Sequence, residues 1–175
     1  ARQNLPAVRQ PFEGGAIVCP DAKVKKHIDH LKNFGFVNET TVVATGINGK
    51  LNEVQAAFGL LNLKHLDDNL AARARIDHAY REGLAGTPGI GCPPLPDGRH
   101  NYAYFPILVK PDYSLSRDEL FQSLADAGIH GRRYFYPLIP DFPMYRHLPS
   151  AQASNLPVAT QLASQVICLP LYPGL

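Results

Sequence analysis

Residues 46–57 read GINGKLNEVQAA. The glycines and short polar residues predict a turn, and apolar residues at helical spacing from Leu51 onward predict a helix directly after it. A turn in this place exposes backbone and short side-chain donors near a helix N-terminus, which suits an anion such as phosphate. A simple capped loop is the alternative interpretation, and this stretch alone leaves both open.

A second stretch, residues 128–138, reads GIHGRRYFYPL. Arg132 and Arg133 stand beside alternating aromatic residues that include Tyr134 and Tyr136. Paired arginines next to aromatic rings can bind a diphosphate and stack on a base or a sugar. The alternative is an edge strand that carries two solvated arginines.

Outward from these stretches, strand and helix patterns alternate along the chain. Asp21 and Ser116 are placed to cap helices, and Pro106 indicates an edge strand or a bulge. The patterns predict strands over 15–19, 101–110, 132–136 and 166–173, and helices over 22–33, 51–84 (one long helix or two), 117–127 and 156–164. This interleaving predicts an α/β or α+β fold.

The composition is that of a globular protein. The chain has 175 residues, 45% of them hydrophobic and 18% charged, enough for one ordinary domain or slightly more. A net charge of +2 gives no electrostatic case for a nucleic-acid partner. No apolar run approaches the roughly 20 residues of a membrane-spanning helix.

Cysteine and histidine spacing gives no metal or disulfide pattern. Cys19, Cys92 and Cys168 are odd in number and far apart, which favours a reduced, cytoplasmic setting over a disulfide framework or a zinc ribbon. His27 and His30 could share a metal, but no third ligand stands nearby, so we interpret them as part of a solvated helix face.

Three further segments join the two stretches in one pattern: EGGA at residues 13–16, FPI at 105–107 and LPLYP at 169–173. Together, from Phe12 to Pro173, the five segments resemble the DegT/StrS-type family of nucleotide-sugar aminotransferases, which use pyridoxal phosphate. Residues 132–138, together with NLPVA at 155–159, are most similar to the members that act on dTDP-4-keto-6-deoxyglucose. The resemblance implies an α/β protein, the C-terminal part of a fold-type-I aminotransferase with a long interdomain helix and an α+β small domain.

The resemblance also implies a division of the chain. We expect an irregular or displaced segment at 1–11, the end of the large cofactor domain and a dimer-spanning loop at 12–50, a linking helix at 51–86, and a truncated small domain at 87–175. The family's Schiff-base lysine falls on Ala7 in an ungapped alignment, and residues 1–12 contain no lysine. We therefore expect a fragment that is inactive alone and does not bind pyridoxal phosphate covalently.

Site residues follow from the family's motifs. The resemblance implies that Asn48 binds the phosphate of the pyridoxal phosphate in the partner subunit. Lys50 stands where the family usually has arginine, and Ile139 stands where many members have a substrate-binding histidine. The implied substrate-binding set is Lys50, Arg132, Arg133, Tyr134 and Tyr136; no metal ligand is implied.

The implied activity is transfer of an amino group from an amino acid such as glutamate to a nucleotide-linked keto sugar, in the biosynthesis of deoxyamino sugars such as those of lipopolysaccharide. The implied protein is a cytoplasmic homodimer with shared active sites and without a nucleic-acid or membrane partner. Two alternatives stay open. One is a sugar dehydratase of the same family, in which histidine replaces the lysine; the other is a non-catalytic domain that only dimerises.

Overall fold

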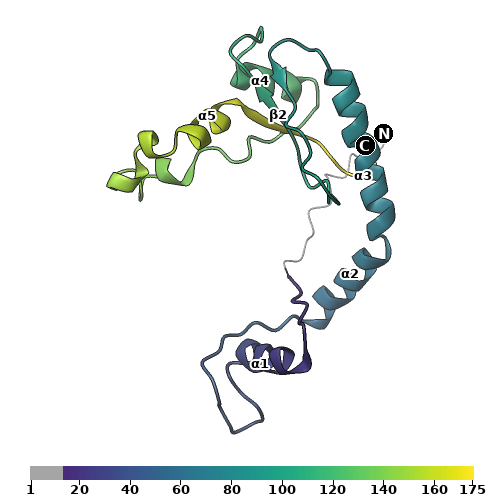
Figure 1. Ribbon diagram of the computed structural model, residues 1–175, viewed down its shortest axis with the longest axis vertical. Coiled ribbons are helices and arrows are strands. Elements are labelled where there is room, and N and C mark those ends of the chain that lie inside the picture. The colour runs from purple at the N-terminus through teal and green to yellow at the C-terminus, as the bar shows by residue number, and fades with distance from the viewer. Residues whose placement is uncertain (1–13) are drawn as a thin grey trace. The chain divides into compact units, whose positions relative to one another are not determined.

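The computed structural model describes residues 14–175, so the expectation for residues 1–11 lies outside the described part. The chain divides into two compact units, Ala1–Leu66 and Asp67–Leu175 (Figure 1). Helices and strands both occur, which confirms the mixed class. The expected segment boundaries at residues 50 and 86 stay predictions.

The first unit is built on two helices. Helix α1 (Ala22–Lys32) begins after Asp21, whose side chain accepts a hydrogen bond from the Val24 N–H at 2.8 Å. The chain leaves the helix through Gly35, which has a φ of 84°. Helix α2 (Glu53–Lys64) begins after Asn52, whose side chain accepts from the Gln55 N–H at 2.9 Å. The predicted cap and the predicted end of α1 are thus confirmed.

The strand predicted over residues 15–19 is wrong. These residues form no strand in the structure, and Ile17 and Val18 are 70% and 95% exposed. A strand is stable only where a neighbour pairs with its backbone groups. No described residue pairs with this stretch, so its apolar pattern has no sheet to join.

The helical pattern over residues 51–84 forms two helices. Helix α2 ends at Lys64 and is capped by His65, whose N–H donates to the Asn62 carbonyl, and helix α3 (Leu66–Leu84) follows. Helix α3 ends ahead of Gly86, which has a φ of 74°. Of the two expected forms, one helix or two, the structure has the second.

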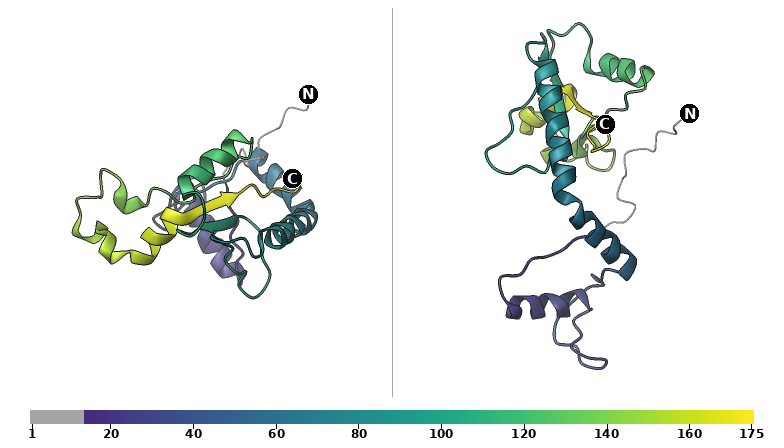
Figure 2. Two further views of the ribbon diagram at one scale, coloured as in Figure 1. Left: turned by 90° about the horizontal axis from the view of Figure 1, so that it is seen from above. Right: turned by 90° about the vertical axis from the view of Figure 1, so that its right-hand side faces the viewer.

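The second unit encloses a small antiparallel sheet. Strands β1 (Ile90–Gly91), β2 (Phe105–Val109) and β3 (Val166–Leu169) lie in the order β1-β2-β3. Phe105 pairs with Leu169 and Ile107 with Ile167. The core consists of Phe105, Ile107, Val109 and Ile167, against which side chains of α3 and of α4 (Arg117–Asp126) pack. Figure 2 shows the ribbon from two further sides. This unit thus combines helices with a small antiparallel sheet.

Pro106 lies in the central strand and its register with β3 is unbroken, so the expectation of an edge strand or a bulge is wrong. The N–H and carbonyl groups of Cys168, opposite Pro106, both bond to Arg132, at 2.7 and 2.9 Å. The position of the missing Pro106 N–H therefore faces the β1 side. On that side, β1 pairs only with Val109 and Leu108 of β2, so no strand of the described chain lies opposite Pro106 and no ladder hydrogen bond is lost.

The two helices predicted after residue 110 are confirmed. The capping box at Ser116 and Glu119 opens α4, and α5 (Pro157–Gln165) lies where a helix was expected. The regular structure of the 137–154 stretch is limited to the short 3₁₀ helices η1 (Ile139–Asp141) and η2 (Pro149–Ala151) and the start of η3 (Ala153–Asn155).

The strand predicted over 132–136 is wrong. Only Arg132 pairs, with Cys168, and the backbone then turns at Tyr134 and Phe135, which takes the later residues out of reach of β3.

No helix among residues 14–175 is long and apolar enough to cross a membrane.

Candidate functional site

In the first unit, the turn at 46–49 is held against the end of α1. The Ile47 N–H donates to the Leu31 carbonyl and the Gly49 N–H to the Lys32 carbonyl, both at 2.8 Å. These two backbone donors are therefore used within the unit and are not available to an anion. What the turn presents instead is the exposed Asn48 side chain, which has no hydrogen-bond partner among residues 14–175.

Two glycines allow this close approach. A Cβ on Gly46 would overlap the Gly35 nitrogen and the Leu31 carbonyl oxygen, and a Cβ on Gly35 would overlap the Ala44 carbonyl oxygen. Gly35 also has a positive φ, which disfavours other residues. The glycines thus fix the backbone that carries Asn48.

Lys50 lies on the same exposed segment. Its Nζ is 5.3 Å from the centroid of the Phe34 ring, a cation–π contact. No carboxylate of the described chain forms an ion pair with it. The first unit therefore offers a carboxamide and an ammonium group, two donors suited to phosphate.

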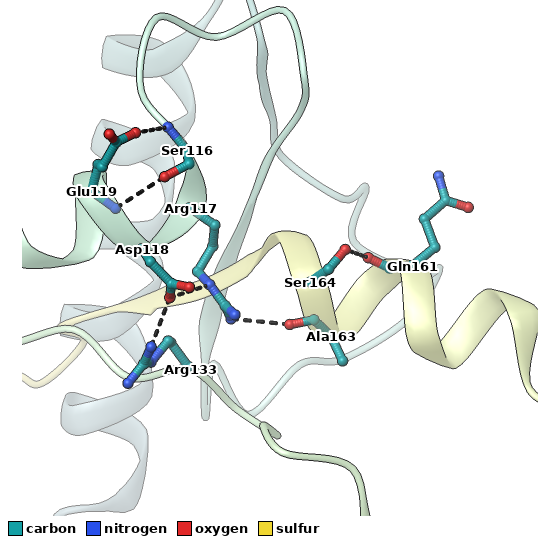
Figure 3. A network of polar contacts seen from close by, with 8 residues as sticks. All are labelled: Ser116, Arg117, Asp118, Glu119, Arg133, Gln161, Ala163 and Ser164. Carbon is teal, nitrogen blue, oxygen red and sulfur yellow. Dashed lines mark hydrogen bonds and ion pairs between the residues drawn. The ribbon is translucent and has the colours of Figure 1, made fainter. Parts of the chain in front are cut away.

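In the second unit, Arg132 and Arg133 have separate partners. Arg133 donates to Oδ1 of Asp118 on α4 at 2.6 Å (Figure 3), and its guanidinium carbon lies 4.6 Å from the centroid of the Phe121 ring. Arg132 is exposed and donates to the Tyr134 hydroxyl at 2.9 Å. No carboxylate among residues 14–175 pairs with Arg132. Of the two arginines, Arg132 is therefore the one whose charge remains available to an anion.

The aromatic residues beside these arginines are fixed by packing. Tyr134 meets Tyr104 edge to face, with ring centroids 5.5 Å apart, and stacks on Phe135 at 4.8 Å. Tyr136 is 50% exposed, and the guanidinium carbon of Arg117 lies 4.6 Å from its ring centroid. The arrangement offers partly exposed aromatic rings near one free guanidinium group.

Arg117 and Asp118 are residues that the sequence pattern singled out only as the start of a helix. Arg117 is buried, with 6% exposure, and its Nε lies 2.8 Å from Oδ1 of Asp118. The hydrogen bond from Arg133 is the main cause that lowers the pKa of the Asp118 carboxyl. The adjacent Arg117 and Asp118 were the available sequence signal for this network. Arg133, which completes it, lies 15 residues from Asp118 in the chain.

Cofactor and metal binding can be tested on the described residues. The unpaired Asn48 carboxamide and the Lys50 ammonium group fit the phosphate of pyridoxal phosphate. A lysine that could bind the cofactor covalently is absent before Lys23 in the sequence. In residues 14–175, no three metal-ligating side chains come together, at His27 and His30 or elsewhere.

Residues 9–175 match the family model described as DegT/DnrJ/EryC1/StrS aminotransferase family, and the chain belongs to this family. It is 52% identical over 165 residues to a dTDP-4-amino-4,6-dideoxy-D-glucose transaminase of Escherichia coli, covering 94% of this chain and 44% of the relative. The enzyme of that name from Shigella dysenteriae is 48% identical over 166 residues, with the same coverage. The chain thus spans less than half the length of these curated relatives.

Solved structures agree with this membership. One is S. venezuelae DesV in complex with a ketimine intermediate, with a TM-score of 0.78, 31% identity, and coverage of 89% of this chain and 41% of that chain. Another is DesI in the presence of its TDP-sugar product, with a TM-score of 0.75, 32% identity, and coverage of 90% and 40%. The family resemblance derived from the motifs is confirmed.

Proposed function

We propose that the full-length protein carrying this chain transfers an amino group from glutamate to the keto group of dTDP-4-keto-6-deoxyglucose, with pyridoxal phosphate as cofactor. The observation that carries the proposal is the 52% identity, over 94% of the chain, to a dTDP-4-amino-4,6-dideoxy-D-glucose transaminase. The site residues described above support the same chemistry from the structure's side.

Arg132 is the proposed contact to the diphosphate or the sugar. Its guanidinium group is exposed and has no carboxylate partner in the described chain, so its charge is free to pair with an anion. Tyr134 and Tyr136 are proposed to stack on the base or the sugar. Arg133 belonged to the predicted set too, but its pairing with Asp118 favours a supporting role.

Asn48 and Lys50 are proposed to serve phosphate groups from the first unit. The Asn48 carboxamide donates to the cofactor phosphate of the partner subunit in a homodimer with shared active sites, and Lys50 adds a positive charge beside a phosphate of cofactor or substrate. When bound, pyridoxal phosphate supplies the electron sink and stores the amino group between donor and sugar. The protein's own part is to hold, orient and exchange protons with the reactants.

The proposed cellular compartment rests on the state of the cysteines. All three cysteines are free in the structure, and burial raises the pKa of the Cys92 and Cys168 thiols, which makes them poor nucleophiles. Free thiols favour a reducing, cytoplasmic compartment.

The test is product analysis with the full-length protein, glutamate, pyridoxal phosphate and dTDP-4-keto-6-deoxyglucose. We expect an aminated sugar nucleotide by mass spectrometry and an equal amount of 2-oxoglutarate. A dehydrated sugar without new nitrogen would support the dehydratase alternative instead. If the substrate is recovered unchanged by a folded, cofactor-loaded protein, the proposed function is wrong.

A further inference from the structure

Arg117 is a buried cation that the proposed reaction does not use. Its side chain is 6% exposed, and arginine keeps its charge at any accessible pH. A buried charge is costly unless it is paired and hydrogen-bonded. Arg117 donates from Nη1 to the Ala163 carbonyl at the end of α5, at 3.0 Å, and pairs through Nε with Asp118 (Figure 3).

Asp118 links this buried cation to the candidate site. The same oxygen, Oδ1, lies 2.8 Å from Nε of Arg117 and 2.6 Å from Nη1 of Arg133. The Arg117 contact is an ion pair without good hydrogen-bond alignment, since Nε has no aligned acceptor. The carboxylate therefore holds two guanidinium groups at one point, one from α4 and one from residues 132–136.

Tyr136 completes the connection. Its ring centroid is 4.6 Å from the guanidinium carbon of Arg117 and 5.6 Å from that of Arg133. Since the side chain is still 50% exposed, part of the ring stays available to a ligand. Two cations thus fix one ring by cation–π contact, and the ring belongs to the segment that carries Arg132 and Tyr134.

We infer that Arg117 is a positioning residue for nucleotide-sugar binding. With Asp118 it holds Arg133 and Tyr136 in place, and so fixes the backbone from which Arg132 and Tyr134 meet the substrate. The inference rests on the proposed function, and it moves Arg133 from substrate contact to support. If Arg117 only joined α4 to α5, it would contribute to folding and not to substrate binding. Kinetics of folded variants separate these two roles.

The experiment is a double-mutant cycle in the full-length holoenzyme with Arg117→Lys, Tyr136→Leu and the double variant. Lysine keeps the charge but cannot pair with Asp118, reach Ala163 and stack on Tyr136 together. We expect each single change to raise the KM for the sugar nucleotide about 3- to 20-fold, and the double variant to be clearly less than multiplicative, because contacting residues couple. For Arg117→Lys, the rate of cofactor conversion by glutamate alone, without sugar, should stay within about twofold of wild type.

Arg99→Lys is the matched control, because Arg99 pairs with Asp67 in an exposed contact in the same unit. This variant should leave unchanged both the KM for the sugar nucleotide and the rate of cofactor conversion by glutamate alone. If Arg117→Lys does not fold, Asp118→Asn with Tyr136→Leu takes its place in the cycle, since Asp118 is 61% exposed and tolerates the change better. A folded variant with wild-type KM, or fully multiplicative effects, overturns the inference. Failure of the wild-type enzyme to aminate the sugar overturns the proposed function instead.

Discussion

Arg132 and Arg133 are adjacent in the sequence but differ in what they can bind. Successive side chains of a strand point to opposite faces, so the strand expected over 132–136 predicts that only one of the two arginines meets the substrate. The strand is absent, yet the two side chains still diverge, because Arg133 pairs with Asp118 and Arg132 with the Tyr134 hydroxyl. The different partners therefore do not come from strand alternation. The sequence could not show which arginine is held by a carboxylate, since Asp118 lies on helix α4, far from Arg133 in the chain.

The first residue-scale prediction concerns this difference. Arg132→Ala removes a charge-assisted contact worth about 1.5–3 kcal/mol, so the KM for the sugar nucleotide should rise about 10- to 150-fold. Arg133→Ala should raise it less, because that guanidinium is held by Asp118. Steady-state kinetics of both variants in the full-length enzyme, with Arg99→Ala as control, measure the effect. A larger rise for Arg133→Ala would reverse the assignment.

A second prediction concerns acid stability. The pKa of Asp118 is lowered in the folded protein, mainly by the hydrogen bond from Arg133. A depressed carboxyl pKa stabilises the fold above the unfolded value, about 3.9, and that stabilisation is lost as pH falls through the folded value. Asp118→Asn should therefore lower the free energy of unfolding near neutral pH, and the difference should shrink below about pH 4. Urea unfolding at several pH values measures it; a difference independent of pH would contradict the ion pair.

At the scale of elements, what depends on neighbouring residues was predictable and what depends on distant ones was not. The caps at Asp21 and Ser116 need only residues three positions along the chain. The strands expected at 15–19 and 132–136 needed a partner strand, which apolar pattern alone does not reveal. Pro106 shows the same limit, because its tolerance depends on how far β1 extends.

The capping box gives the element-scale prediction. Ser116 accepts from the Glu119 N–H at 3.3 Å and its own N–H donates to the Glu119 carboxylate at 2.7 Å. Ser116→Ala removes one cap, so unfolding should become easier by about 1 kcal/mol, measured by denaturant titration. Ser123→Ala, in the exposed interior of the same helix, is the control and should be neutral or slightly stabilising. Equal effects of the two changes would show that the cap does not stabilise α4.

At the scale of the whole molecule, five short motifs predicted the family, whereas composition and periodicity alone stopped at a mixed helix–strand domain. The candidate residues fall into both units, with Asn48 and Lys50 in one and the arginines and tyrosines in the other. Their roles came from the family's motifs and not from spacing. How the residues act together therefore has to be tested in the assembled enzyme.

The last prediction is that Asn48 acts across a dimer. Loss of its hydrogen bond to a charged phosphate costs about 1.5–3 kcal/mol, so an Asn48→Ala enzyme should bind cofactor about 10- to 150-fold more weakly. It should still fold, because Gly35 and Gly46, which shape the turn, remain. Cofactor affinity by fluorescence titration and unfolding by circular dichroism separate the two effects.

Subunit mixing decides in which subunit Asn48 acts. Asn48→Ala subunits are combined with subunits that lack the Schiff-base lysine of the full-length enzyme. In the heterodimer, the intact lysine belongs to the Asn48→Ala chain, and the other chain supplies an intact Asn48 to the same site. If the residue reaches across the interface, one wild-type-like site per heterodimer should appear, although neither parent homodimer is fully active. If heterodimers form and activity does not return, Asn48 serves the cofactor of its own subunit, and the turn at 46–49 is not a dimer-spanning element.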